Sequence, residues 1–275
     1  MHLYDEPKID AHCHIFDPER FAYAADVAYR PAGQERGTLR QYLAVMDAYG
    51  IRHALLVGPN SGYNLDNRCL LDALARHPDR FRGIAVVKND ISRAELLALR
   101  QAGVIGVAWN AAMLGVDYYA GAAAQLRHLA ELDMVAQVQV QGDQLVALRP
   151  MLEASGARIL IDHAGRPEPQ AGLDQPGFQA LLALAKSGRV AVKLSGYVKF
   201  SHTPAPHPDA LTYVRALIDA YSLDACLWAS DWPYLRAPER IDMGPLLRQL
   251  EQLLPDSADR QRLWWETPRR WLGLA

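Results

Sequence analysis

Short hydrophobic runs recur along the chain, and stretches with a helical spacing of hydrophobic positions lie between them. Strand-like runs are present at Ile9–Phe16, His53–Pro59, Phe81–Val87, Val104–Asn110, Val135–Gln141, Arg158–Gly165, Val190–Gly196 and Ala225–Pro233. Helical periodicity is present at Arg68–Arg76, Arg93–Ala102, Gly121–Leu132, Gln144–Ser155, Phe178–Lys186 and Asp209–Tyr221. Regular alternation of strand and helix predicts parallel pairing through right-handed crossovers, and eight units of this kind close a (β/α)8 barrel.

The same pattern indicates one domain with its functional site at one end. The 275 residues are close to the roughly 250 of a typical barrel, and no linker or shift in composition divides them. We therefore expect residues 1–275 to form a single TIM-like (β/α)8 barrel, an α/β fold whose site lies at the C-terminal ends of the strands. A doubly wound open sheet is the alternative, but no Gly-x-Gly-x-x-Gly sequence follows the first run.

Composition and charge exclude several classes of protein. Hydrophobic residues make up 50% of the chain and the net charge is −2 with both signs dispersed, so we expect neither a nucleic-acid-binding nor a membrane-binding surface. Cys13, Cys69 and Cys226 are widely spaced and odd in number, which indicates a reducing compartment. With no signal peptide and no hydrophobic run of membrane-spanning length, the chain is expected to be cytoplasmic, and a homo-oligomer is left open.

Two histidines, one residue apart, end the first strand-like run. Because side chains alternate across a strand, His12 and His14 should point the same way. Two neighbouring imidazoles at the end of a strand suit either metal ligation or polarisation of a carbonyl oxygen. The alternative is a pair of core histidines satisfied by hydrogen bonds.

Other runs also end in polar residues. His163 lies near the end of the sixth run and Asp231 near the end of the eighth. Lys193, within the seventh, is expected to make a buried pairing rather than a Schiff base. In a closed barrel the C-terminal ends of all strands lie on one face, so His163 and Asp231 should join the two histidines of the first run there.

The motifs around these residues, taken in order, are Asp-x-His-x-His, Leu-x-Asp-His-x-Gly-x-Pro, Lys-x-Ser-Gly and Ser-Asp-Trp-Pro. This set resembles the amidohydrolase superfamily, and within it the lactonase branch that includes 2-pyrone-4,6-dicarboxylate lactonase. The resemblance implies a hydrolase that opens a small-molecule lactone with water. Asp231 would take the proton of the attacking water, while His12, His14 and His163 would polarise the scissile carbonyl, directly or through a metal.

The resemblance also implies four substrate-binding residues: Tyr29, Ser61, Arg166 and Lys199. For Arg166, pairing with a nearby acidic side chain is an equally good interpretation. Lys199 stands where the family has an arginine, and Ala108 and Leu114 stand where the pyrone dicarboxylate lactonase has two arginines that grip substrate carboxylates. We therefore expect a different lactone, with fewer carboxylates.

The metal content is left open by these residues. Binuclear members of the superfamily use a lysine or glutamate bridge on the fourth strand and a histidine on the fifth, and the corresponding runs here carry neither. A single zinc or other divalent ion on His12, His14 and Asp231 is one possibility, and no metal is the other.

Two further functions compete with the lactone hydrolase. One is a single-metal decarboxylase of the same superfamily. The other is a catalytically inactive barrel that binds a ligand, although the loss of a site residue expected for such a protein is not seen.

Overall fold

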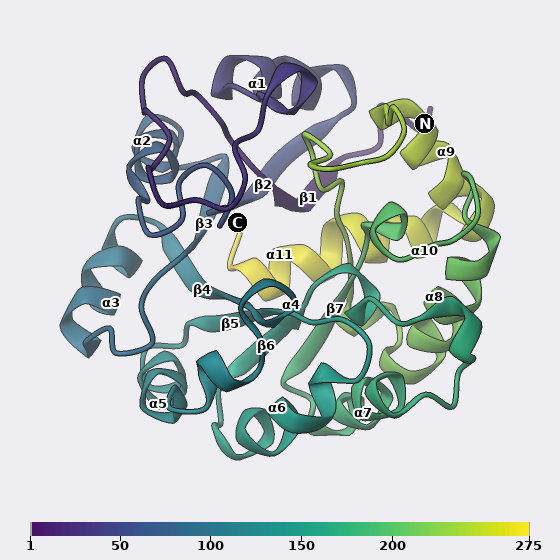
Figure 1. Cartoon of the computed structure of the whole chain (residues 1–275). Coiled ribbons are helices and arrows are strands. Elements are labelled where there is room, and N and C mark those ends of the chain that lie inside the picture. Colours follow the sequence, from purple (N-terminus) through teal and green to yellow (C-terminus); the bar gives the residue numbers. More distant parts are fainter. Residues whose placement is uncertain (1, 275) are drawn as a thin grey trace. The chain divides into compact units, whose positions relative to one another are not determined.

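The computed structural model describes residues 2–274, and its strands follow the predicted alternation (Figure 1). All eight strands belong to one sheet, in which their order is their order along the chain. The strands are β1 (Lys8–Cys13), β2 (Ile51–Val57), β3 (Phe81–Ala85), β4 (Val104–Asn110), β5 (Val135–Gln139), β6 (Arg158–Ile161), β7 (Val190–Leu194) and β8 (Cys226–Trp228). This order, with parallel pairing, is that of a TIM-like (β/α)8 barrel, so the predicted fold class is confirmed.

The helices alternate with the strands, and all the predicted helical stretches form helices. The helices are α1 (Leu39–Ala48), α2 (Arg68–Arg76), α3 (Arg93–Gln101), α4 (Ala111–Leu114), α5 (Ala123–Glu131), α6 (Gln144–Ala154), α7 (Pro176–Leu184), α8 (Pro208–Tyr221), α9 (Met243–Leu253), α10 (Ser257–Gln261) and α11 (Thr267–Leu272). Helices α1, α4, α9, α10 and α11 lie outside the predicted stretches. A capping box begins α1, where the Thr38 hydroxyl accepts a hydrogen bond from the Gln41 backbone amide. The prediction used only the spacing of hydrophobic residues, which does not detect a capping box.

The chain is divided into two compact units, of which the first contains the residues up to Val86 and those from Leu227 onward. In this unit β1 pairs in parallel with β2 and β2 with β3, and every residue of β1 is buried. The first residue of β1, Lys8, donates to the backbone oxygens of Leu3 and Glu6, both at 2.6 Å. Burial lowers the pKa of Lys8 to about 8.

A buried ion pair fixes the C-terminal helices of the first unit to the start of the chain. The Arg260 guanidinium in α10 donates to the Glu6 carboxylate at 2.8 Å and to the Pro255 carbonyl at 2.7 Å. The side chains of Arg260 and Glu6 are only 7% and 10% exposed. Removing one partner would leave the other charge buried and uncompensated, so this pair holds the chain's two ends together.

The second unit runs from Val87 to Cys226 and contains β4–β7 with the helices that cover one side of them (Figure 1). Three buried side chains on neighbouring strands form a closed polar triangle. The Lys193 ammonium lies 3.0 Å from Asp162 Oδ1 and donates to Gln137 Oε1 at 2.6 Å, while Gln137 Nε2 donates to Asp162 Oδ2 at 2.9 Å. The expected buried pairing of Lys193 is therefore confirmed. Gln137, which the sequence did not predict, hydrogen-bonds both Lys193 and Asp162.

The described part of the chain contains no helix with both the length and the hydrophobicity needed to cross a membrane.

Replacing Arg260 by Ala should lower the free energy of unfolding by about 3 kcal/mol, because the Glu6 carboxylate would remain buried without its partner. The matched control is Arg149→Ala, which breaks an exposed pair with Glu153 in α6 and should cost about 0–1 kcal/mol. Urea denaturation followed by circular dichroism measures both, and equal losses in the two variants would contradict the assignment.

Candidate active site

Three of the predicted site residues meet in the first unit. The Nε2 atoms of His12 and His14 are 3.3 Å apart, and Asp231 Oδ1 lies 3.8 Å from the first and 3.7 Å from the second. All three residues are buried. Strand β1 ends at Cys13 rather than at the predicted Phe16, but the two imidazoles still lie on one side as the alternation requires.

Asp231 is held in place by backbone pairing between its loop and the end of β1. Its amide donates to the His12 carbonyl at 2.9 Å, and the His14 amide donates to the Trp232 carbonyl at 2.8 Å. Strand β8 ends at Trp228, so the prediction of a strand to Pro233 was wrong beyond that residue. The reason is the left-handed backbone of Asp231 (φ +59°), a conformation that costs a non-glycine residue about 1 kcal/mol and cannot continue a strand.

Asp10, which the sequence reasoning left without a role, links the two segments. Its carboxylate accepts hydrogen bonds from the His12 and Ser230 amides at 3.1 and 2.9 Å and from the Tyr42 hydroxyl at 2.7 Å. The Ser230 hydroxyl donates to it as well. Burial raises the pKa of Asp10, and the hydrogen bonds from Ser230, Tyr42 and His12 oppose that shift. Its place two residues before His12, as the first member of Asp-x-His-x-His, was the available signal.

The cluster can hold a metal ion. His14 Nδ1 lies 2.7 Å from the Val57 carbonyl, which can only accept, so Nδ1 carries the proton and Nε2 of the neutral ring presents its lone pair. Three ligand atoms, from His12, His14 and Asp231, lie within 4.8 Å of one another. Ligands of a tetrahedral zinc site lie about 3.3 Å apart, so the observed separations of 3.3–3.8 Å fit one ion.

In the second unit, the imidazole of His163 is positioned by Ser195 and Gly196 of the Lys-x-Ser-Gly motif. Its Nδ1 lies 3.0 Å from the Ser195 hydroxyl, and the histidine is 2% exposed. A Cβ atom on Gly196 would come within 2.5 Å of that Nδ1, and the backbone there has a φ of +63°. Both facts require glycine, so the Ser-Gly pair of Lys-x-Ser-Gly holds the imidazole by a hydrogen bond and by leaving it space. Strand β6 ends at Ile161, short of the predicted Gly165.

Arg166 and Lys199, two predicted substrate-binding residues, line the same cavity of the second unit. The cavity has a volume of about 230 Å³, and Glu168 and His202 also line it. It therefore brings two cationic side chains close to a contact between His202 Nε2 and Glu168 Oε1, which are 3.3 Å apart. Arg166 has a left-handed backbone (φ +46°), which turns the chain away from β6.

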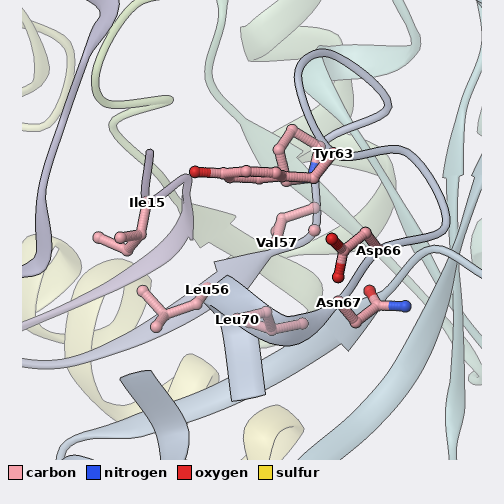
Figure 2. Close-up of a pocket in the computed structure, with 9 residues that line it drawn as sticks. Ile15, Leu56, Val57, Tyr63, Asp66, Asn67 and Leu70 are labelled. Atoms are coloured by element: carbon pink, nitrogen blue, oxygen red, sulfur yellow. The ribbon is translucent and has the colours of Figure 1, made fainter. Parts of the chain in front are cut away.

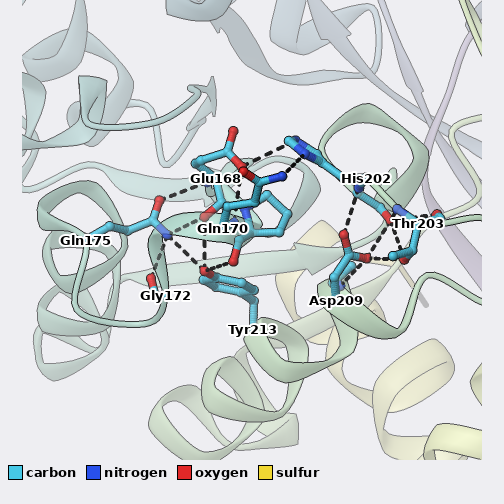
Figure 3. A network of polar contacts seen from close by, with 11 residues as sticks. Glu168, Gln170, Gly172, Gln175, His202, Thr203, Asp209 and Tyr213 are labelled. Atoms are coloured by element: carbon cyan, nitrogen blue, oxygen red, sulfur yellow. Dashed lines mark hydrogen bonds and ion pairs between the residues drawn. The ribbon is translucent and has the colours of Figure 1, made fainter.

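The two loops beside this cavity are joined by a network of polar contacts (Figure 3). Gln175 donates from Nε2 to the Glu168 carbonyl at 2.9 Å and to the Tyr213 hydroxyl at 3.0 Å. At the start of α8, Asp209 accepts from the Thr203 hydroxyl at 2.6 Å and from the His202 amide at 2.7 Å, both in the other loop (Figure 3). Burial would raise the pKa of Asp209, but these hydrogen bonds outweigh it and lower the pKa to about 2.

The remaining two predicted residues, Tyr29 and Ser61, lie in loops of the first unit. The Tyr29 hydroxyl donates to Glu35, and the Arg236 guanidinium lies over the Tyr29 ring at 5.2 Å. Burial and the hydrogen bond to Glu35 raise the pKa of Tyr29 to about 12, so its hydroxyl is a proton donor at neutral pH. The Ser61 carbonyl accepts from the Tyr63 amide at 2.7 Å in the turn after β2.

A small cavity lies under this turn, between Tyr63, Val57 and Asp66 (Figure 2). Its volume is about 10 Å³. A cavity of this size holds at most one water molecule, so it is not a substrate pocket.

The family model for amidohydrolases matches residues 9–274. The chain belongs to the amidohydrolase family. The 4-sulfomuconolactone hydrolase of Rhizobium radiobacter is 32% identical to it over 96% of this chain and 89% of the relative. The 2-pyrone-4,6-dicarboxylate hydrolase of Comamonas testosteroni is 27% identical over 95% and 88%. A crystal structure from Pseudomonas putida, provisionally named as a 2-pyrone-4,6-dicarboxylic acid hydrolase, superposes with a TM-score of 0.86 at 32% identity, over 100% of this chain and 99% of the other.

This amidohydrolase should bind at most one zinc ion tightly per chain, because the cluster of His12, His14 and Asp231 offers ligands for one ion. His14→Ala should weaken zinc binding by at least about a hundredfold, since it removes one of three ligands. His77→Ala removes a histidine outside the cluster and should leave the affinity unchanged. Elemental analysis and competition with a chromogenic chelator measure both, and two tightly bound ions per chain would contradict the prediction.

Proposed function

We propose that this amidohydrolase hydrolyses a lactone, with Asp231 as the base that activates water. The observation that carries the proposal is the buried Asp231 carboxylate, 3.8 and 3.7 Å from the imidazoles of His12 and His14. The 4-sulfomuconolactone and pyrone-dicarboxylate hydrolases to which the chain is similar over most of its length support the same reaction class.

Asp231 moves the proton in this reaction. An ionised carboxylate accepts hydrogen bonds and offers no proton, so Asp231 orients a water molecule and takes its proton as the oxygen attacks the lactone carbonyl. The protonated carboxyl then returns that proton to the ring oxygen as it leaves. The low exposure of Asp231, 4%, keeps bulk water from competing for the proton.

His12 and His14 polarise the lactone carbonyl in one of two ways: by donating from Nε2 when that nitrogen is protonated, or by holding a cation through the Nε2 lone pair. Because the His14 Nδ1–H is held by the Val57 carbonyl, its Nε2 is aimed at the space beside Asp231 with a lone pair. His12, His14 and Asp231 would hold a divalent ion, which supplies a Lewis acid when it is bound. The proton transfers remain those of Asp231.

We assign His163 to the same reaction because the C-terminal ends of all strands share one face in a (β/α)8 barrel. Its ring is held by the contact of Nδ1 with the Ser195 hydroxyl. Arg166 and Lys199, which line one cavity, provide positive charge for a single substrate carboxylate or for the departing oxygen. Tyr29 and Ser61 contact the substrate in the same assignment.

The substrate that we propose is a lactone with fewer carboxylates than pyrone dicarboxylate. Ala108 and Leu114 cannot donate hydrogen bonds from their side chains, and Leu114, the last residue of α4, is 41% exposed. A carboxylate bound beside them would lose its hydration without gaining a partner. This departure separates the chain from the pyrone-dicarboxylate hydrolases.

Asp231→Asn should lower kcat for the best lactone by at least about a hundredfold, because the amide keeps the shape of the side chain but cannot accept the proton of water. Asp47→Asn makes the same change at an exposed position of α1 and should leave kcat unaltered. A lactone panel assayed by pH-stat gives both values. Near wild-type turnover by the Asp231 variant would remove this residue from the role of base.

The kcat/KM for 2-pyrone-4,6-dicarboxylate should stay below about 10⁵ M⁻¹s⁻¹, and a lactone with one carboxylate or none should exceed it. Leu114→Arg should raise the value for the dicarboxylate by about tenfold, since a guanidinium can pair with the second carboxylate. Leu114→Met keeps the position apolar and should not. Efficient turnover of the dicarboxylate by the wild type would refute the substrate assignment.

A further inference from the structure

We propose that Asp10 is a positioning residue, which sets the separation between the Asp231 carboxylate and the imidazoles of His12 and His14. Through that separation it determines how tightly the cluster binds a divalent cation and how well Asp231 is placed for catalysis. The catalytic part rests on the proposed lactone hydrolysis, whereas the part concerning cation affinity does not.

One oxygen of the Asp10 carboxylate bridges the two backbone segments that carry the cluster. Asp10 Oδ1 accepts from the His12 amide at 3.1 Å in β1 and from the Ser230 amide at 2.9 Å in the loop after β8. These two amides belong to a cluster residue and to the residue directly before Asp231. A single buried atom therefore fixes both sides of the cluster relative to each other.

The other oxygen fixes the same loop through side chains. Asp10 Oδ2 accepts from the Tyr42 hydroxyl of α1 at 2.7 Å and from the Ser230 hydroxyl. The Ser230 hydroxyl oxygen in turn accepts from the Trp232 amide at 3.0 Å. The residues on both sides of Asp231 are thus tied, directly or through one hydroxyl, to the Asp10 carboxylate.

Asp231 needs such support because its own backbone is left-handed, with a φ of +59°. Two main-chain hydrogen bonds, from Asp231 to His12 and from His14 to Trp232, set the register between its loop and β1. The carboxylate of Asp10, which is 0% exposed, accepts hydrogen bonds from both of the segments that these main-chain bonds join. Groups that orient metal ligands from behind in this way alter metal affinity by about 10–100-fold when they are removed.

The test measures the cobalt affinity of the metal-free protein by visible absorption, with the folded state of each variant checked by circular dichroism. Asp10→Ala should raise the dissociation constant for Co²⁺ by about 10–100-fold. Asp10→Asn should restore much of the affinity, because the amide oxygen can accept from both backbone amides and the amide nitrogen can donate to the two hydroxyl oxygens.

Asp209→Asn is the matched control. Its carboxylate also accepts from backbone and hydroxyl donors, but it lies in the first turn of α8, in the second unit. It should lower stability and leave the dissociation constant for Co²⁺ unchanged. A folded Asp10→Ala variant with wild-type affinity would overturn the proposal, and so would equal weakening by Asp209→Asn or a wild-type chain that binds no cobalt. Because the readout is cation affinity, a wild-type chain that binds cobalt but opens no lactone refutes the proposed function alone.

Discussion

The carboxylate of Asp10 is the contact on which the first unit's cluster depends. Residues from β1, from α1 and from the loop after β8 all donate to it, and these segments are far apart in the sequence. A buried carboxylate with this many donors is favourable only when every donor is in place. The geometry of His12, His14 and Asp231 is therefore a property of the folded unit rather than of any one segment.

The second unit also contains a buried carboxylate whose hydrogen-bonding capacity is satisfied, but here one of its partners is a cation. Lys193, Asp162 and Gln137 satisfy one another across three neighbouring strands, so their burial leaves no charge without an opposite partner. Asp162 directly precedes His163, and this triangle fixes the end of β6 from which that imidazole projects. In both units, a buried polar contact behind the strand end holds the residue that faces the substrate in the proposed reaction.

Much of the fold could be predicted from the sequence, because strands and helices differ in the spacing of hydrophobic residues and each strand here is a short, separate run. The pairing of His12 with His14 follows from alternation along β1 in the same way. The positions of Asp231 and Arg166 could not be predicted so well, since both have left-handed backbones after their strands end. The roles of Asp10 and Tyr42 depend on hydrogen bonds between distant segments, which have no periodic signature.

The loop that contains His202 is held by Asp209 in the first turn of α8. Ser201, Thr203 and the His202 amide all donate to the Asp209 carboxylate, which closes the loop on itself at the start of α8 (Figure 3). A surface loop that is anchored at one place tolerates changes in its outward-facing residues at little cost to the scaffold. Laboratory evolution of a new substrate preference can therefore begin in this loop, where residues facing the Arg166 and Lys199 cavity vary independently of the His–Asp cluster.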